Sequence, residues 1–149
     1  MKLNNKGFTL IEILAAVTIM GILAGIGVAS YTRYQEKVRN DAYEAMEKSA
    51  YAAAQNYLQS TGSIVPEEPN YRTIDVQTLV DGGYLNELID PRTKNTHCHS
   101  GSYVKVTKKP SVGTKLEEYT YIVTIKCRHY TSSRKNAAGA TVEGKQYKG

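Results

Sequence analysis

The sequence predicts an α+β fold in which one long N-terminal α-helix packs on a small antiparallel β-sheet. Three observations support this prediction. Residues 8–29 are almost entirely apolar. Residues 31–59 contain neither proline nor glycine and are rich in alanine, which favours continuation of a helix. Beyond residue 100, two segments alternate apolar and polar residues, as half-buried strands do.

The apolar segment is long enough to cross a membrane, since its 22 residues would form a helix of roughly 33 Å. It contains a single carboxylate, Glu12. Such a group costs on the order of 2.5–3.5 kcal/mol at the centre of a bilayer, so it indicates a function and needs a partner. Cleavage between Gly7 and Phe8 would create one, a new α-ammonium group at the start of the helix. The ammonium group of a neighbouring identical helix could equally meet Glu12 and fix the register of the two helices.

Residues 6–12 read KGFTLIE and are followed by the apolar helix. This pattern resembles the prepilin signature of type IV pilins and pseudopilins, and the resemblance extends loosely over the first 60 residues. It implies cleavage after Gly7, N-methylation of Phe8 and an assembly role for Glu12. It also implies four partners: further copies in a helical filament, the prepilin peptidase, a pilus assembly ATPase and an inner-membrane platform protein. The precursor would be a single-pass membrane protein, and the product a filament on the cell surface.

Three other interpretations of the apolar segment are weaker. A secretory signal cut before Ser30 would be shorter and would lack Glu12. A plain membrane anchor explains the length but not the glycine, phenylalanine and carboxylate pattern. A buried helix of a soluble protein is disfavoured because the segment has no polar face. Basic residues follow the segment as well as precede it, so the positive-inside rule alone mildly favours the opposite orientation; we follow the resemblance and the cysteines.

The predicted organisation is a leader peptide (1–7), a transmembrane and assembly half of the helix (8–29) and an extracellular globular domain (30–149). Within that domain, residues 30–59 form an amphipathic helix, residues 60–101 a loop region, and residues 102–149 the sheet and tail. The single helix is expected to run from residue 8 to residue 59, and Gly62 to end it in a left-handed conformation. Residues spaced by three and four form its expected inner face: Val38, Ala42, Ala45, Met46, Ser49, Ala50, Ala53 and Tyr57.

The loop region is expected to contain a short helix over residues 75–80, closed by Gly82. Strands are predicted over residues 102–108 and 118–127, paired as a hairpin through a long loop that includes residues 109–113. A third strand is expected near residues 140–147. Two apolar sets should pack on the core: Tyr84, Leu85, Leu88 and Ile89 from the loop, and Tyr119, Tyr121, Val123, Ile125 and Cys127 from one face of the second strand.

The two cysteines flank the predicted hairpin, because Cys98 precedes its first strand and Cys127 ends its second. A disulfide between them would close about 30 residues, contribute roughly 3–4 kcal/mol and indicate an oxidising, extracytoplasmic location. A metal site is the alternative, because His97 and His99 adjoin one cysteine and His129 lies near the other. The adjacent His-Cys-His sequence lacks the usual spacing of zinc ligands, which makes this alternative less favoured. Free thiols are a third interpretation.

No catalytic motif is present, so we expect neither an enzyme nor a cofactor. The neighbouring carboxylates at residues 67–68 and 117–118 are interpreted as surface charge. The net charge of the chain is +5. Its tail after Cys127 is basic and could bind DNA or an anionic surface ligand, although a solvated tail is the favoured interpretation. The basic residues of this tail, opposed by Glu143 alone, are Arg128, Arg134, Lys135, Lys145 and Lys148.

The sequence therefore predicts a structural subunit, a pilin, of an extracellular type IV pilus-like filament that assembles through Phe8 and Glu12. Within this class a major pilin is weakly favoured. A minor pilin, or a pseudopilin of a DNA-uptake or type II-like secretion system, is the first alternative. A monomeric, membrane-tethered binding module with a basic tail is the alternative from another class.

Overall fold

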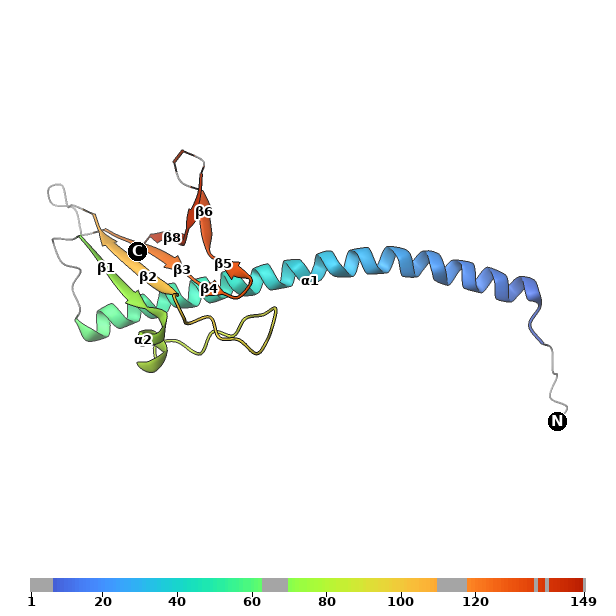
Figure 1. Cartoon of the computed structure of the whole chain (residues 1–149), viewed down its shortest axis with the longest axis horizontal. Coiled ribbons are helices and arrows are strands. Elements are labelled where there is room, and N and C mark those ends of the chain that lie inside the picture. The colour runs from blue at the N-terminus through green and yellow to red at the C-terminus, as the bar shows by residue number, and fades with distance from the viewer. Residues whose placement is uncertain (1–6, 63–69, 110–117, 136, 139, 149) are drawn as a thin grey trace. The chain divides into compact units, whose positions relative to one another are not determined.

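The computed structural model describes residues 7–62, 70–109, 118–135, 137–138 and 140–148. The chain divides into two compact units, Met1–Asn40 and Asp41–Gly149. Helix α1 (Leu10–Thr61) contributes to both units, and all of the strands belong to the second (Figure 1). A long helix with an apolar start, followed by an antiparallel sheet, confirms the predicted α+β class.

Helix α1 begins two residues later and ends two residues later than the predicted range of 8–59. Gly62 follows it with a φ of +60°, so the expected left-handed residue is confirmed. The hydroxyl groups of the last turn contribute to this end, since Thr61 Oγ1 donates to the carbonyl oxygen of Tyr57 at 2.6 Å. The prolines and carboxylates of residues 63–69 lie outside the described residues.

The inner face of α1 in the second unit is only partly the predicted one. Ala50 and Ala53 are buried and Met46 and Tyr57 are partly buried, as expected. Ala45 and Ser49 are exposed, and so is Val38 in the first unit, which makes those three predictions wrong. The predicted face included neither Tyr43 nor Glu47. The buried positions of α1 are Tyr43, Glu47, Ala50, Ala53 and Ala54.

The main sheet is antiparallel, with strand order β1-β2-β3-β8. Its centre is the predicted hairpin of β2 (Tyr103–Lys108) and β3 (Tyr119–Thr124), in which residue 103 pairs with residue 124 and residue 108 with residue 119. The hairpin loop at residues 110–117 lies outside the described residues. Strand β1 (Tyr71–Asp75) forms one edge within the segment predicted as a loop region. Strand β8 (Lys145–Lys148) forms the other edge.

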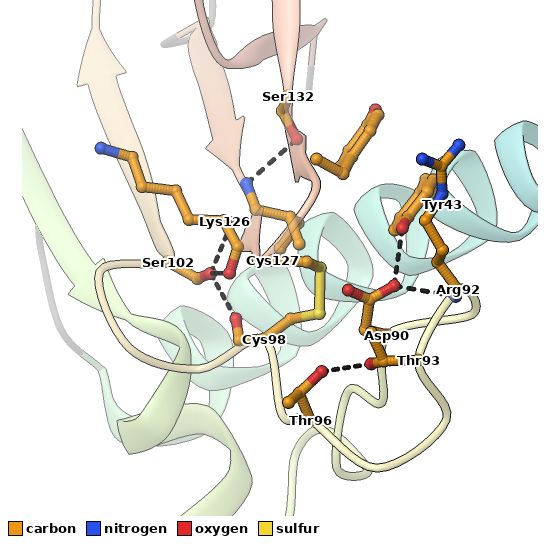
Figure 2. Close-up of a disulfide and its surroundings, with 12 residues drawn as sticks. Tyr43, Asp90, Arg92, Thr93, Thr96, Cys98, Ser102, Lys126, Cys127 and Ser132 are labelled. Atoms are coloured by element: carbon orange, nitrogen blue, oxygen red, sulfur yellow. Dashed lines mark hydrogen bonds between the residues drawn. A yellow bond between two sulfur atoms is a disulfide. The ribbon is translucent and has the colours of Figure 1, made fainter.

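The predicted strand over residues 118–127 is divided at Ile125, so its predicted length is wrong. Beyond β3, strand β4 (Lys126–Cys127) pairs with β5 (Tyr130–Thr131) in a separate small sheet. Two buried serine hydroxyl groups satisfy the backbone where the chain changes sheets. Ser132 Oγ accepts a hydrogen bond from the amide of Ile125 at 3.0 Å, and Ser102 Oγ accepts one from the amide of Lys126 at 2.8 Å (Figure 2).

The predicted strand near residues 140–147 is also divided in two. Strand β7 (Thr141–Glu143) pairs with β6 (Ser133–Lys135), whereas β8 joins the main sheet. Gly144 separates β7 from β8 with a φ of +81°, and a Cβ atom there would lie 2.5 Å from Cγ2 of Ile122. A glycine is therefore required at this division, both for its conformation and for the close approach of β3.

Helix α2 (Val76–Asp81) begins one residue later than the predicted range of 75–80. It ends before Gly82, as expected. Of the loop residues predicted to pack on the core, Leu85 and Leu88 are buried and Tyr84 is partly buried, whereas Ile89 is 44% exposed, so that assignment is wrong. The core joins the alanine face of α1 to α2 and the central strands. Its fully apolar members are Ala50, Ala53, Ala54, Ile74, Val76, Leu79, Leu85, Leu88, Val104, Val106, Val123 and Ile125.

Two hydrogen-bonded tyrosine and carboxylate pairs extend this core, and the sequence interpretation missed both. The Tyr43 hydroxyl donates to Oδ1 of Asp90 at 2.6 Å, as Figure 2 shows, and the Tyr130 hydroxyl donates to Oε1 of Glu47 at 2.7 Å. The two tyrosine rings stack with centroids 3.9 Å apart. Both carboxylates are almost completely buried. The pairs therefore tie α1 to the loop before β2 and to β5.

Asp90 makes the free energy of unfolding depend on pH in the acid range. Burial raises the pKa of this carboxyl group. Hydrogen bonds from Tyr43 and from the backbone amides of Arg92 and Thr93 lower the pKa, and the net result is a pKa below the ordinary value. A depressed pKa stabilises the folded state above the unfolded value of about 3.9, and this contribution is lost as the pH falls below it. We expect Asp90→Asn to make acid unfolding less steep with pH.

The measurement is acid titration of the full chain in detergent micelles, followed by the near-ultraviolet circular dichroism of its tyrosines. Asp41→Asn, which changes an exposed carboxylate of α1, is the matched control and should leave the profile unchanged. Tyr43→Phe removes one hydrogen bond to a buried charge and should cost about 1–3 kcal/mol at neutral pH. A profile for Asp90→Asn that superimposes on that of the wild type would contradict the assignment.

Candidate functional site

The predicted cleavage position lies at the accessible N-terminal end of the described chain. Gly7 and Phe8 belong to neither a helix nor a strand, and both are exposed, with 83% of Phe8 accessible. Among the described residues, no atom other than those of Gly7 and its chain neighbours lies within 4 Å of the position of a Cβ on Gly7. Both residues of the predicted cleavage position are therefore accessible. The rest of the predicted leader, residues 1–6, lies outside the described residues.

Glu12 lies in the first turn of α1 and forms a capping box with Thr9. Its Oε2 atom accepts hydrogen bonds from the backbone amide and from the hydroxyl group of Thr9, both at 2.8 Å. In return the amide of Glu12 donates to Oγ1 of Thr9 at 3.3 Å. The helix begins at Leu10 because these bonds satisfy backbone donors that a helix N-terminus otherwise leaves open. Glu12 thus has a partner within its own chain.

Thr9 is the residue of this site that the sequence interpretation missed. The signal was present, because a threonine followed three residues later by glutamate, directly before an apolar run, is the pattern of a capping box. The interpretation instead considered Glu12 only as a charge that needs a cation. The structure brings Thr9 and Glu12 together and places Phe8 directly before the cap.

The first half of α1 presents apolar side chains on all sides, and none of those at residues 10–28 is buried. Among the described residues, α1 is the one helix long and apolar enough to cross a membrane. An apolar surface of this extent requires lipid or other apolar helices around it. The large side chains exposed along it are Leu10, Ile11, Ile13, Leu14, Val17, Ile19, Met20, Ile22, Leu23, Ile26 and Val28.

Cys98 and Cys127 form a disulfide, with Cα atoms 4.5 Å apart (Figure 2). Both sulfur atoms are therefore unavailable as thiolate ligands, so the alternative of a zinc site built on the cysteines is wrong, and so is that of free thiols. His129 lies in the exposed turn between β4 and β5. His97 and His99 flank Cys98, and the centroids of their rings are 5.3 Å apart.

The basic tail does not present all of its charges to solvent. The guanidinium group of Arg134 donates to the carbonyl oxygens of Glu143 and Gly144 at 2.6 and 3.1 Å. Nζ of Lys145 lies 3.6 Å from Oε2 of the buried Glu47 and 3.7 Å from a carboxylate oxygen of Glu44. These contacts use the two side chains to hold the tail on the fold, which weakens the case for a DNA-binding patch.

Comparison with known proteins finds a family match near the N-terminus. Residues 2–28 match the family described as "Prokaryotic N-terminal methylation motif". Over 55 residues the chain is 34% identical to the "Type IV major pilin protein PilA" of Myxococcus xanthus, and the match covers 37% of this chain and 25% of that protein. The chain thus spans about a quarter of the curated relative. No solved structure matches it significantly.

These findings confirm the predicted resemblance to type IV pilins and pseudopilins where it was strongest. The family match covers the segment that contains Gly7, Phe8 and Glu12, together with most of the apolar residues that follow. The family match ends at residue 28, so it covers neither α2 nor the strands.

Proposed function

We propose that the chain is the precursor of a structural subunit, not an enzyme, and that it polymerises into an extracellular filament of the type IV pilus class. The observation that carries this proposal is an exposed apolar helix whose first turn holds a carboxylate, directly after an accessible glycine and phenylalanine. Such a surface needs a lipid environment first and neighbouring helices later.

Processing would convert the N-terminus into an assembly site. Cleavage after Gly7 leaves an α-ammonium group on Phe8, and methylation of its nitrogen preserves the positive charge. The capping box keeps the Glu12 carboxylate at the same end of the helix. In a stack of parallel helices, the ammonium group of one subunit would meet the carboxylate of its neighbour. Because a charge in a low-dielectric surrounding is costly when unpaired, this pairing would select a single register.

Several partners follow from this class of function. A prepilin peptidase would process the precursor in the membrane, and an assembly ATPase with an inner-membrane platform protein would extract the subunits. The named relative is a major pilin, which favours a major subunit over a minor pilin or a pseudopilin of a DNA-uptake or secretion system. A monomeric membrane-tethered module remains the competing function.

The N-terminus of the polypeptide in cells tests the proposal. Intact-protein mass spectrometry should find a chain that begins at N-methylated Phe8. Electron microscopy of sheared surface fibres, labelled with antibodies against the globular part, should find the same polypeptide in filaments. In the Gly7→Leu variant we expect the leader to be retained and the fibres to be lost. A wild-type chain that keeps Met1 and never oligomerises would contradict the proposal and support the tethered module.

A further inference from the structure

We propose that His97 and His99 form a binding site for a divalent transition-metal ion of the zinc, copper or nickel type, with both imidazoles on one ion and water as the remaining ligands. This site differs from the cysteine-based one considered above, because both cysteines remain in the disulfide. It is also independent of the assembly residues at the N-terminus.

The separation of the two rings fits a shared metal ion. Their centroids lie 5.3 Å apart, with 27° between the ring planes. With metal–nitrogen bonds of about 2.0–2.1 Å and a tetrahedral angle, two imidazoles on one zinc ion have centroids about 5 Å apart. The observed separation is therefore compatible with both rings binding one ion.

The backbone that carries the two histidines is held in place on several sides. Cys98, between them, is joined to Cys127, and its amide donates to the carbonyl oxygen of Leu88 at 2.8 Å. His97 forms a β-bridge with Ile89. The carbonyl oxygen of His99 accepts a hydrogen bond from the amide of Ser102 at 3.0 Å. A preorganised pair of ligands loses little conformational freedom when it binds an ion.

The surroundings of each imidazole favour its use as a ligand. Nδ1 of His97 lies 3.6 Å from Oε2 of Glu87, and a carboxylate beside the second ring nitrogen commonly orients a metal-binding histidine. That contact leaves Nε2 of His97 to face an ion. Nδ1 of His99 makes no hydrogen bond within the described part of the chain.

Both rings line an open hollow of about 540 Å³, which is also lined by Asp75, Gln77 and Ser100. This volume accommodates an ion with its water ligands, and the Asp75 carboxylate adds negative charge to the wall. Within the described residues, no group of three or more histidine, cysteine or carboxylate side chains is placed to hold a metal. Two imidazoles are thus the ligands that the described residues supply to the proposed site, and imidazole nitrogen selects zinc, copper and nickel over calcium and magnesium.

The test is titration of the full chain with Zn²⁺ by isothermal calorimetry at neutral pH, in detergent micelles and without a polyhistidine tag. We expect one ion per chain. His97→Asn and His99→Asn should each weaken binding at least about tenfold, as the loss of a ligand in a two-ligand site requires. His129→Asn removes the remaining histidine of the chain and should leave the affinity unchanged. Mg²⁺ at the same concentration should not compete.

A second measurement avoids the question of whether a variant folds. Bound Zn²⁺ should protect His97 and His99 of the wild-type chain from diethylpyrocarbonate, and leave His129 as reactive as before, as peptide mass spectrometry would report. No uptake of Zn²⁺ by the wild type, wild-type affinity in either His97→Asn or His99→Asn, or equal protection of all three histidines would each overturn the proposal. The filament function would stand in any of these cases, because it depends on residues 7–12.

Discussion

Filaments should disappear when Glu12 is replaced by alanine, while the globular part stays folded. The substitution removes the carboxylate that would pair with the ammonium group of a neighbouring subunit. It does not touch the second unit of the structure, since Glu12 bonds only to Thr9 among the contacts described for it. The measurement combines electron microscopy of sheared fibres with immunoblots of the membrane fraction. The tyrosine circular dichroism of the purified chain should match that of the wild type.

Two further variants separate charge pairing from helix capping. Glutamine serves in a capping box as glutamate does, so Glu12→Gln keeps the cap and removes the charge. We expect it to lose filaments as Glu12→Ala does. Thr9→Val removes a capping hydroxyl but retains both the backbone amide and the Glu12 carboxylate, and should retain filaments. Normal fibres from Glu12→Gln would show that Glu12 acts only as a cap and would contradict the assembly mechanism.

Removal of the disulfide should produce the largest loss of stability. A cross-link between residues 29 apart lowers the conformational entropy of the unfolded chain. In the chain-entropy account this adds about 3–4 kcal/mol to the free energy of unfolding. The double variant with Cys98→Ser and Cys127→Ser should therefore unfold at a clearly lower denaturant concentration. The double variant also avoids a single unpaired thiol, which would exchange with other chains.

Reductant provides the matched control for this prediction. It should destabilise the wild-type chain by a similar amount and have no effect on the double serine variant. Urea titrations of the full chain in detergent micelles, with and without reductant, measure both effects. A wild-type transition that is insensitive to reductant, with the thiols shown to be free by alkylation, would refute the role assigned to the cross-link.

The sequence predicted those elements whose periodicity was strong and uninterrupted. Helix α1 has apolar and alanine-rich halves without a proline, and β2 and β3 alternate clearly. Strand β1 was missed because, of its two less exposed residues, Arg72 and Ile74, only Ile74 is apolar, so burial alternates along the strand while hydrophobicity does not. The division at Ile125 could not be predicted, because it depends on tertiary hydrogen bonds that the amides of Ile125 and Lys126 donate to the hydroxyl oxygens of Ser132 and Ser102.

The N-terminal site and the buried tyrosine and carboxylate pairs differ in how far the sequence revealed them. Gly7, Phe8 and Glu12 are adjacent in the chain and form a pattern that needs no tertiary information. The buried pairs of Tyr43 with Asp90 and Tyr130 with Glu47 join residues that are far apart in sequence. Patterning alone assigns a glutamate such as Glu47 to solvent, since buried carboxylates are rare unless a specific partner is present. The partners became evident only in three dimensions.

The bond between Cys98 and Cys127 also has a mechanical consequence. It encloses β2 and β3, the two central strands, in a covalent ring. If tension were applied to the ends of one subunit, α1 and β8 could be peeled away, but the residues inside the ring could not be drawn out. The contour length that a stretched subunit can release is thus shorter by the length of the roughly 30 residues inside the ring. Reduction of the disulfide would release that length as well.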